Sequence, residues 1–272
     1  MVGSAHRSAL TIGLVCLVVW SFGLSSFILK LRWDSVKRPG PPLYEAFPYG
    51  EIRIGVDASY PPFAYVLEGE LYGFDIDVGK EIAERLGYPY RFINMGYDGL
   101  YDSVTADQVD ILISALLIDP HRLADIRYTS AYFDAGLVLV WNQGSTFTDI
   151  SDLESTRIAF EFGSASDSLI RKWLRRYEGF DTQAYELSRY ALDALRIRKA
   201  DYALVDAVSY ALYQKEHGDW KNDFKIVDPA PISIAIRSDR LATWELVEQK
   251  LIEMKADGGL KQILEQWLFV EK

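Results

Sequence analysis

The sequence predicts an α/β protein of two lobes with similar plans and a ligand cleft between them. Short apolar runs alternate with segments of helical periodicity, which is the pattern of βαβ units. Four of these runs end in a polar residue, and small ligands bind outside the carboxyl ends of strands in open α/β sheets. The four strand-end residues are Asp57, Ser114, Glu161 and Asp206, two in each half of the chain.

Residues 52–56 predict a buried strand that delivers Asp57 to a loop. Two consecutive prolines stiffen this loop, so the rings of Tyr60 and Phe63 are expected to be held for stacking against a ligand. A simpler interpretation stays open, in which Asp57 merely ends a strand and both aromatic residues belong to the core.

A helix is expected over residues 73–87, because apolar residues recur on one face and Gly87 can end it. Strands are expected at 90–93 and 110–113. The chain then leaves the sheet towards Arg122, a basic residue close to a strand end.

The second half repeats this plan. A turn of small residues around Ser164 and Ala165 precedes a helix, and the free N–H groups at a helix start can bind an anion such as a carboxylate. The remaining expected elements are strands at 135–141, 158–160, 202–205 and 232–236, and two closing helices separated at Gly258 and Gly259.

Composition excludes several classes of function. Residues 1–42 hold five of the 29 basic and one of the 39 acidic residues, so 24 basic and 38 acidic residues give 43–272 a net charge of −14. Such a surface repels phosphate backbones, so nucleic-acid binding is not expected. The only cysteine, Cys16, lies in the N-terminal apolar segment, and the three histidines are scattered. No metal, cofactor or histidine-based catalytic site is therefore expected.

Residues 8–29 carry no charge and are long enough to span a bilayer as a helix. We expect an uncleaved membrane anchor, followed by a stiff proline-rich linker that ends at residue 42. Cleavage as a signal peptide, after the small residues at 23–26, is the alternative. The basic residues that follow the segment would place the globular part in the cytoplasm, in conflict with the location implied below.

Seven segments resemble family 3 of the extracytoplasmic solute-binding proteins, which serve polar-amino-acid ABC transporters. The resemblance implies a type II periplasmic binding fold with lobe 1 at 43–139 and 232–272 and lobe 2 at 140–231. It also implies a two-strand hinge near 138–141 and 232–236. The matching segments are GVDASYPPF (55–63), GFDIDVGKEIAERLG (73–87), YDGLYDSV (97–104), DILISALLIDPHR (110–122), YTSAYFDAGLVLV (128–140), RKADYALVD (198–206) and KLIEMKADGGLKQILEQWL (250–268).

The resemblance also implies roles for individual residues. Arg122 is expected to hold a ligand α-carboxylate through two parallel hydrogen bonds. Backbone N–H groups near Leu117, Ser164 and Ala165 would assist it, and Asp206 would accept from the α-ammonium. The full set of expected ligand-binding residues is Asp57, Tyr60, Phe63, Tyr97, Ser114, Leu117, Arg122, Glu161, Ser164, Ala165 and Asp206.

The ligand side chain is expected to lie between Tyr60 and Tyr97, and Asp57 is expected either to face its far end or to orient other contacts. The chain departs from the family pattern at Leu117, where a hydroxyl residue is usual, and at Asp119, where threonine is usual. Glu161 either replaces the lost amine contact, pairs with a basic ligand side chain, or points to solvent. Ala115 and His121 are further departures, the first from a usual glycine or serine and the second from a usual acid or similar residue.

Three functions are compatible with these residues. The first is a monomeric solute-binding protein of the periplasm or cell surface, which captures an amino acid or related carboxylate by lobe closure and presents it to an ABC transporter permease. The second is a prephenate or arogenate dehydratase, for which Glu161 and His121 are the only candidate acids or bases. The third is a membrane-anchored sensing domain, although the sequence contains no kinase, cyclase or methyl-acceptor segment.

Overall fold

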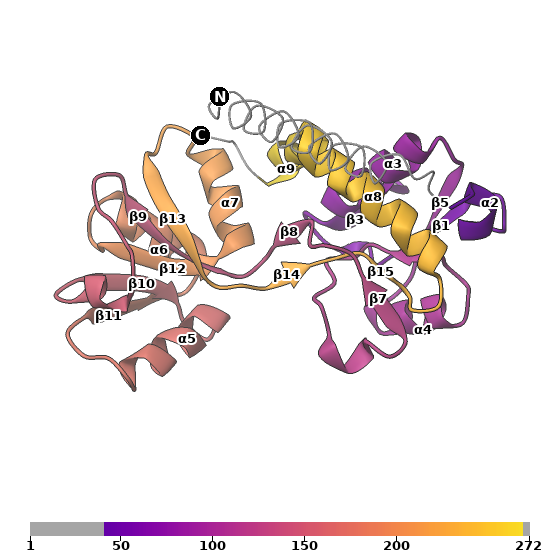
Figure 1. Cartoon of the computed structure of the whole chain (residues 1–272). Helices are drawn as coiled ribbons and strands as arrows, with labels where there is room; N and C mark the ends of the chain where they lie inside the picture. Colours follow the sequence, from indigo (N-terminus) through magenta and orange to yellow (C-terminus); the bar gives the residue numbers. More distant parts are fainter. Residues whose placement is uncertain (1–40, 269–272) are drawn as a thin grey trace, which may run out of the picture. The chain divides into compact units, whose positions relative to one another are not determined.

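The computed structural model describes residues 41–268 of the chain (Figure 1). The expected N-terminal helix over residues 8–29 lies outside the described residues. Within residues 41–268, none of the helices has the length and apolar character that crossing a membrane requires.

The first lobe contains a five-stranded sheet with the order β5-β1-β6-β15-β7. Strands β5 and β6 run parallel to β1, whereas β15 runs antiparallel to β6 and β7. All residues of β1 are buried, as expected for a strand that is covered on both faces. The strands are β1 (Ile52–Val56), β5 (Tyr90–Asn94), β6 (Ile111–Leu112), β7 (Ile126–Tyr128) and β15 (Ala235–Arg237).

Helices flank this sheet, and a small three-stranded sheet precedes the first long helix. The predicted helix ends are confirmed, because Gly87 and Gly258 both adopt left-handed backbone conformations after α3 and α8. The remaining elements are α2 (Leu43–Ala46), β2 (Ser59–Tyr60), β3 (Ala64–Leu67), β4 (Glu70–Tyr72), α3 (Phe74–Leu86), η1 (Tyr97–Gly99), α4 (Leu100–Thr105), η2 (Pro120–Arg122), α8 (Leu241–Asp257) and α9 (Gly259–Trp267).

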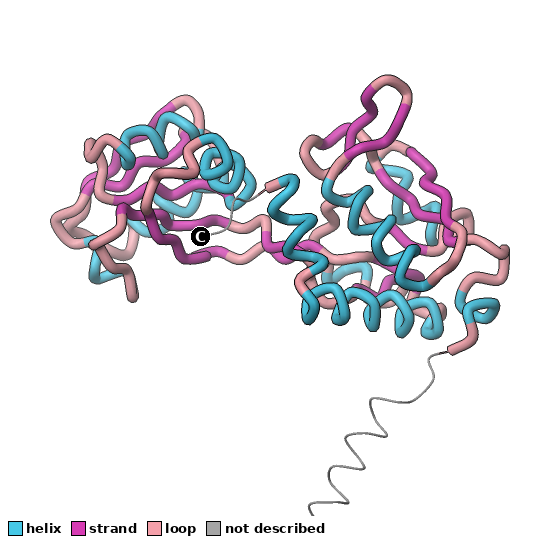
Figure 2. The backbone as a smooth tube through the Cα atoms, turned by 90° about the horizontal axis from the view of Figure 1, so that it is seen from above, coloured by secondary structure: helices cyan, strands magenta, loops and turns pink. Residues whose placement is uncertain are grey.

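The second lobe repeats the plan with the sheet order β11-β10-β12-β9-β13. Strand β10 pairs in parallel with β11 and β12, and β9 pairs antiparallel with β12 and β13. Figure 2 shows helices lying against the strands in this lobe as in the first. Its elements are β9 (Leu137–Asn142), η3 (Ile150–Leu153), β10 (Arg157–Glu161), α5 (Ala165–Leu174), β11 (Asp181–Tyr185), α6 (Ser188–Arg196), β12 (Tyr202–Asp206), α7 (Ala207–Glu216) and β13 (Asn222–Asp228).

Two short strands connect the sheets. The chain leaves the first sheet through β8 (Phe133–Asp134) and returns through β14 (Pro231–Ile232), and the two strands pair antiparallel (Figure 1). The expected lobe boundary after residue 139, and the hinge near 138–141, fall inside β9, whose residues pair with the second sheet from Leu137 onward. The apolar run is continuous in the sequence, and only strand pairing shows where one sheet gives way to the other.

Candidate functional site

The carboxyl ends of β1 and β6 meet at one edge of the first sheet. There the Asp57 backbone N–H donates to the Ser114 hydroxyl oxygen at 3.0 Å. A cavity of about 360 Å³ lies at this edge and is lined by Asp57, Ser59, Tyr60, Tyr97, Ser114, Ala115 and Leu117. The structure therefore brings together the first-lobe residues that strand ends and aromatic spacing indicated, apart from Phe63 and Arg122.

The aromatic residues of this edge differ in accessibility. The side chains of Tyr60 and Tyr97 are 56% and 55% exposed, so their rings are free to contact a ligand. Phe63 is only 1% exposed, and its ring contacts Phe74 and Phe133 in the core. The expectation that Phe63 touches the ligand is corrected: its ring stacks on Tyr60 at a centroid distance of 5.3 Å and supports that ring from behind.

Arg122 lies at the end of η2 and is held by two neighbours. Its Nε lies 3.3 Å from the Asp119 Oδ2, and its guanidinium carbon lies 4.0 Å from the centroid of the Tyr101 ring. The ion pair is longer than a charge-assisted hydrogen bond, and both side chains are partly exposed to solvent. Asp119 therefore pairs with Arg122 loosely, through a contact that a ligand carboxylate can replace.

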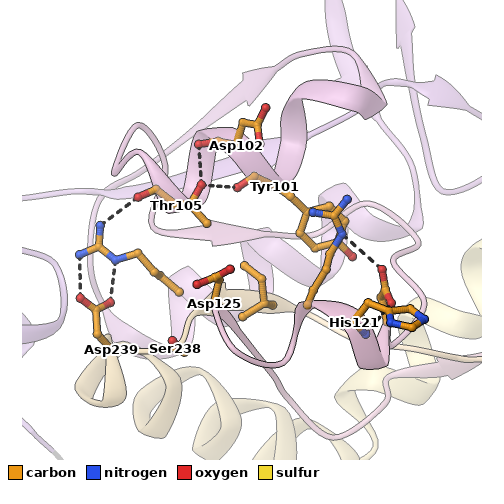
Figure 3. Close-up of a pocket in the computed structure, with 11 residues that line it drawn as sticks. Tyr101, Asp102, Thr105, His121, Asp125, Ser238 and Asp239 are labelled. Atoms are coloured by element: carbon orange, nitrogen blue, oxygen red, sulfur yellow. Dashed lines mark hydrogen bonds and ion pairs between the residues drawn. The ribbon is translucent and has the colours of Figure 1, made fainter.

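Three cavities follow one another along this side of the first lobe. The largest, of about 690 Å³, lies around Tyr101, Asp125 and Ser238 in Figure 3 and includes Arg122 in its lining. A second, of about 430 Å³, shares Arg122 with it. That second cavity shares Tyr97 and Leu117 with the cavity at the end of β1, so Arg122 and Asp57 stand on connected stretches of surface.

A buried carboxylate, which the sequence did not single out, supports the same edge. The Asp75 Oδ2 accepts from the backbone N–H of Ala115 at 2.7 Å, and its Oδ1 accepts from the Tyr132 hydroxyl at 2.7 Å. Burial raises the pKa of Asp75 to about 7, although both hydrogen bonds act to lower it. Ala115 has a φ of 46°, a left-handed conformation that costs a non-glycine residue roughly 1–2 kcal/mol. The sequence signal that could have identified Asp75 was its place between two apolar residues at the start of a helix.

In the second lobe, Glu161 has a role that the sequence did not predict. Its Oε2 accepts from both the backbone N–H and the hydroxyl of Ser188, at 2.8 and 2.6 Å. Ser188 is the first residue of α6, so the carboxylate lies at the positive end of that helix. These bonds give Glu161 a capping role, and the three expected options for its contact with a ligand stay predictions.

Ser164 caps the start of α5, as a small polar residue before a helix can. Its hydroxyl oxygen accepts from the N–H groups of Ser166 and Asp167, and its hydroxyl donates to the Glu161 carbonyl at 2.7 Å. Within residues 41–268, no protein acceptor is bonded to the backbone N–H groups of Ser164 and Ala165. Those two donors are therefore available to an anion.

Asp206 ends β12 and caps α7. Its Oδ1 accepts from the Ser209 backbone N–H at 2.8 Å. A carboxylate can accept about four hydrogen bonds, so this cap leaves capacity for a cationic donor. The pKa of Tyr60 is raised by burial first and by the negative charge of Asp206 second. The negative charge of Asp206 therefore acts on Tyr60, which lines the first-lobe cavity.

An aromatic surface in the second lobe was missed at the sequence level. Phe162 directly follows the strand-end residue Glu161, and its side chain is 66% exposed. It lines a cavity of about 620 Å³ with Ala184, Tyr185, Glu186 and Tyr190. An aromatic residue directly after a strand end was the available signal. In the described part of the chain, no group of three or more His, Cys, Asp or Glu residues could hold a metal ion.

Comparison with known proteins gives a consistent family assignment. The model of the bacterial extracellular solute-binding proteins, family 3, matches residues 52–270. The arginine-binding protein 1 of an Escherichia coli ABC transporter is 27% identical over 223 residues, which cover 80% of this chain and 90% of that protein. The histidine-binding periplasmic protein of Salmonella typhimurium is 26% identical, with coverage of 80% and 87%.

Solved structures agree with this assignment. The unliganded, open L-cystine solute receptor of Neisseria gonorrhoeae superimposes with a TM-score of 0.69 at 23% identity, over 84% of this chain and 97% of the receptor, which supports the fold. An ancestral cationic amino acid solute binding protein gives a TM-score of 0.60 at 25% identity, over 83% and 99% of the two chains.

Proposed function

Because the chain belongs to the bacterial extracellular solute-binding proteins of family 3, we propose that it binds an amino acid outside the cytoplasm and delivers it to the permease of an ABC transporter. The observation that carries this proposal is the presence of complementary groups for both charges of an amino acid. Arg122 and the start of α5 offer donors for a carboxylate, and Asp206 offers an acceptor for an ammonium group.

The carboxylate is bound from two directions. Arg122 is stacked on Tyr101, which limits the rotation of the guanidinium and aims a planar fork of donors. The N–H groups of Ser164 and Ala165 add donors at the positive end of the α5 dipole. Lobe closure brings these donors to one ligand, as in the hinge closure of periplasmic binding proteins that is a standard example of domain motion.

The ammonium group is bound by Asp206, and the ligand side chain lies between Tyr60 and Tyr97. Leu117 places an apolar group in the first-lobe cavity where a hydroxyl would offer a further hydrogen bond. The amine contact therefore depends on Asp206 more than it would with a hydroxyl at position 117. We also propose that the protein is a monomer that is anchored by residues 8–29.

A thermal-shift screen of the full chain with the common L-amino acids tests this function. A ligand at 100 times its Kd adds about 2.7 kcal/mol to the free energy of unfolding. For each amino acid that stabilises the protein, its amide and its α-keto acid are the matched controls, because one lacks the carboxylate and the other the ammonium group. Both controls should give much smaller shifts, and stabilisation by none of the amino acids would contradict the proposal.

The enzymatic alternative depends on Glu161 and His121 as its candidate acids or bases. Glu161, one of its two candidates, accepts two hydrogen bonds from Ser188 at the start of α6. The Oε2 atom is therefore engaged at a helix start, and a general acid or base must in addition lie within hydrogen-bond reach of the substrate. Incubation with prephenate and arogenate, followed by analysis for the dehydrated products, tests the alternative directly.

A further inference from the structure

The Asp75 carboxylate joins two segments that are far apart in the sequence. It is fully buried in the first turn of α3, yet both of its oxygens accept hydrogen bonds from other segments. One bond, at 2.7 Å, comes from the Ala115 N–H at the ligand cavity. The other, also at 2.7 Å, comes from the hydroxyl of Tyr132, which is 2% exposed and directly precedes β8. A buried carboxylate with both oxygens bonded fixes the two segments relative to each other.

The same two segments also meet at the return crossing. The Tyr132 backbone N–H donates to the carbonyl of Ile232 in β14 at 3.0 Å, and Leu117 pairs with Ile232 as an isolated β-bridge. Next to it, the Ser233 N–H donates to the carbonyl of Leu116 at 2.9 Å. The cavity segment 115–117 is thus bonded directly to the strand through which the chain returns to the first lobe (Figure 1).

We propose that Asp75 is a positioning residue that holds Ala115 in its left-handed conformation at the ligand cavity and, through Tyr132, ties that cavity segment to the crossing strands β8 and β14. Because β8 and β14 are the two connections between the lobes, a change in their arrangement is transmitted to the backbone of the cavity. The functional consequence of this inference rests on the proposed ligand site. The hydrogen-bond network of Asp75 is independent of that proposal.

The protonation state of Asp75 is the property of this network that changes with pH. Burial penalises the charged form of its carboxyl and raises the pKa to about 7. In the described residues, the groups that act on this pKa besides burial are the Tyr132 hydroxyl and the Ala115 N–H, and both lower it. Ligand binding that fixes Ala115 strengthens its bond to the charged carboxylate, so affinity should rise as pH increases through this range.

The first test needs no ligand. The amide of Ala115 is followed by NMR from pH 5 to 9 in the full-length chain, labelled with 15N-alanine in detergent solution. Its chemical shift should titrate near pH 7 in wild type and should lose that step in Asp75→Asn. The asparagine can still accept from Ala115 and donate to the Tyr132 hydroxyl, so it keeps the geometry and removes only the charge.

Tyr132→Phe is the second variant, since it keeps the ring and deletes one donor to the carboxylate. Loss of a bond that favours the charged form should move the Ala115 titration to higher pH. A wild-type amide without a step near neutral pH, a step that persists in Asp75→Asn, or a Tyr132→Phe midpoint at or below that of wild type overturns the proposal.

The second test measures ligand affinity between pH 6 and 8 by calorimetry. Each pKa unit by which binding lowers the Asp75 pKa strengthens binding about tenfold across its titration. We expect tighter binding at pH 8 in wild type and a flat profile in Asp75→Asn. His121 is an exposed imidazole in the same lobe, so both profiles are recorded in a His121→Gln background as well.

The two tests separate the failure of this inference from the failure of the proposed function. If wild type binds no amino acid, the proposed function fails, and the Ala115 titration still decides whether the Asp75 network exists. If wild type binds a ligand with an affinity that is independent of pH, or if Asp75→Asn retains the pH dependence, the inference fails while the function stands.

Discussion

Replacement of Arg122 by alanine should weaken ligand binding by about 2 kcal/mol, or roughly 30-fold in Kd. Loss of a desolvated charge pair costs about 2–5 kcal/mol, because the partner carboxylate is left without its counter-ion. The structure favours the lower end of this range. The Arg122 side chain is 46% exposed and already paired with Asp119, so a ligand carboxylate gains only the difference between the two partners.

Asp119→Asn is the matched variant for this prediction. Ion pairs between partly exposed side chains contribute about 0–1 kcal/mol, and this one has a closest approach of 3.3 Å. Removal of the competing carboxylate should therefore strengthen binding, by up to about fivefold in Kd. In an Arg122→Ala background the same change should have little effect, since no guanidinium remains for Asp119 to occupy.

Calorimetry with the ligand found in the screen measures all of these affinities. The free energy of unfolding without ligand is the control, and Arg122→Ala should change it by less than about 1 kcal/mol, the size of an exposed stacking contact with Tyr101. Arg122→Lys should recover part of the affinity, because an ammonium group cannot form two parallel bonds. Binding by the alanine variant within about 0.5 kcal/mol of wild type would refute the assignment of the carboxylate to Arg122.

Three further changes test other parts of the structure. Asp206→Asn should weaken amino-acid binding by about 2 kcal/mol or more in calorimetry while the α-keto acid binds unchanged, and an equal loss for both ligands would contradict the ammonium contact. Arg53→Ala should lower the free energy of unfolding by about 3–5 kcal/mol in urea, because it leaves Asp110 buried and unpaired; a loss below about 1 kcal/mol would argue against this pair. Gly73→Ala should lower the free energy of unfolding by about 1–3 kcal/mol or more, because its Cβ would lie 2.1 Å from a backbone carbonyl oxygen at a φ of 136°. In the control Gly96→Ala, where the added Cβ meets open space, the free energy of unfolding should change by less than about 0.5 kcal/mol.

Two strands of the second lobe could not be predicted from the sequence. Strands β11 and β13 are the two edges of the second sheet, and most of their side chains are exposed or half-buried. Edge strands need no continuous apolar run, so their sequences, DTQAY and NDFKIVD, carry little of the pattern that identifies a buried strand. The central strands β10 and β12 are buried along most of their length and were predicted.

The sequence by itself determined the fold class, the family and the strand-end positions of the candidate site. Burial within one element produces a periodicity of 2 or 3.6 residues, and a glycine that ends a helix lies next to it in the chain, so these features are local. Asp57 and Ser114 meet because both end parallel neighbouring strands, a relation that follows from the fold once the strands are recognised.

The tertiary structure alone decided what each side chain of the site contacts. Glu161 bonds to Ser188, 27 residues away, and Asp75 bonds to Ala115 and Tyr132, 40 and 57 residues away. A hydrogen bond requires two groups within about 3 Å in a suitable direction, and that condition depends on sheet order and helix packing. No periodicity records these distances, so neither the bonds between Glu161 and Ser188 nor the position of Asp75 at this edge was predicted.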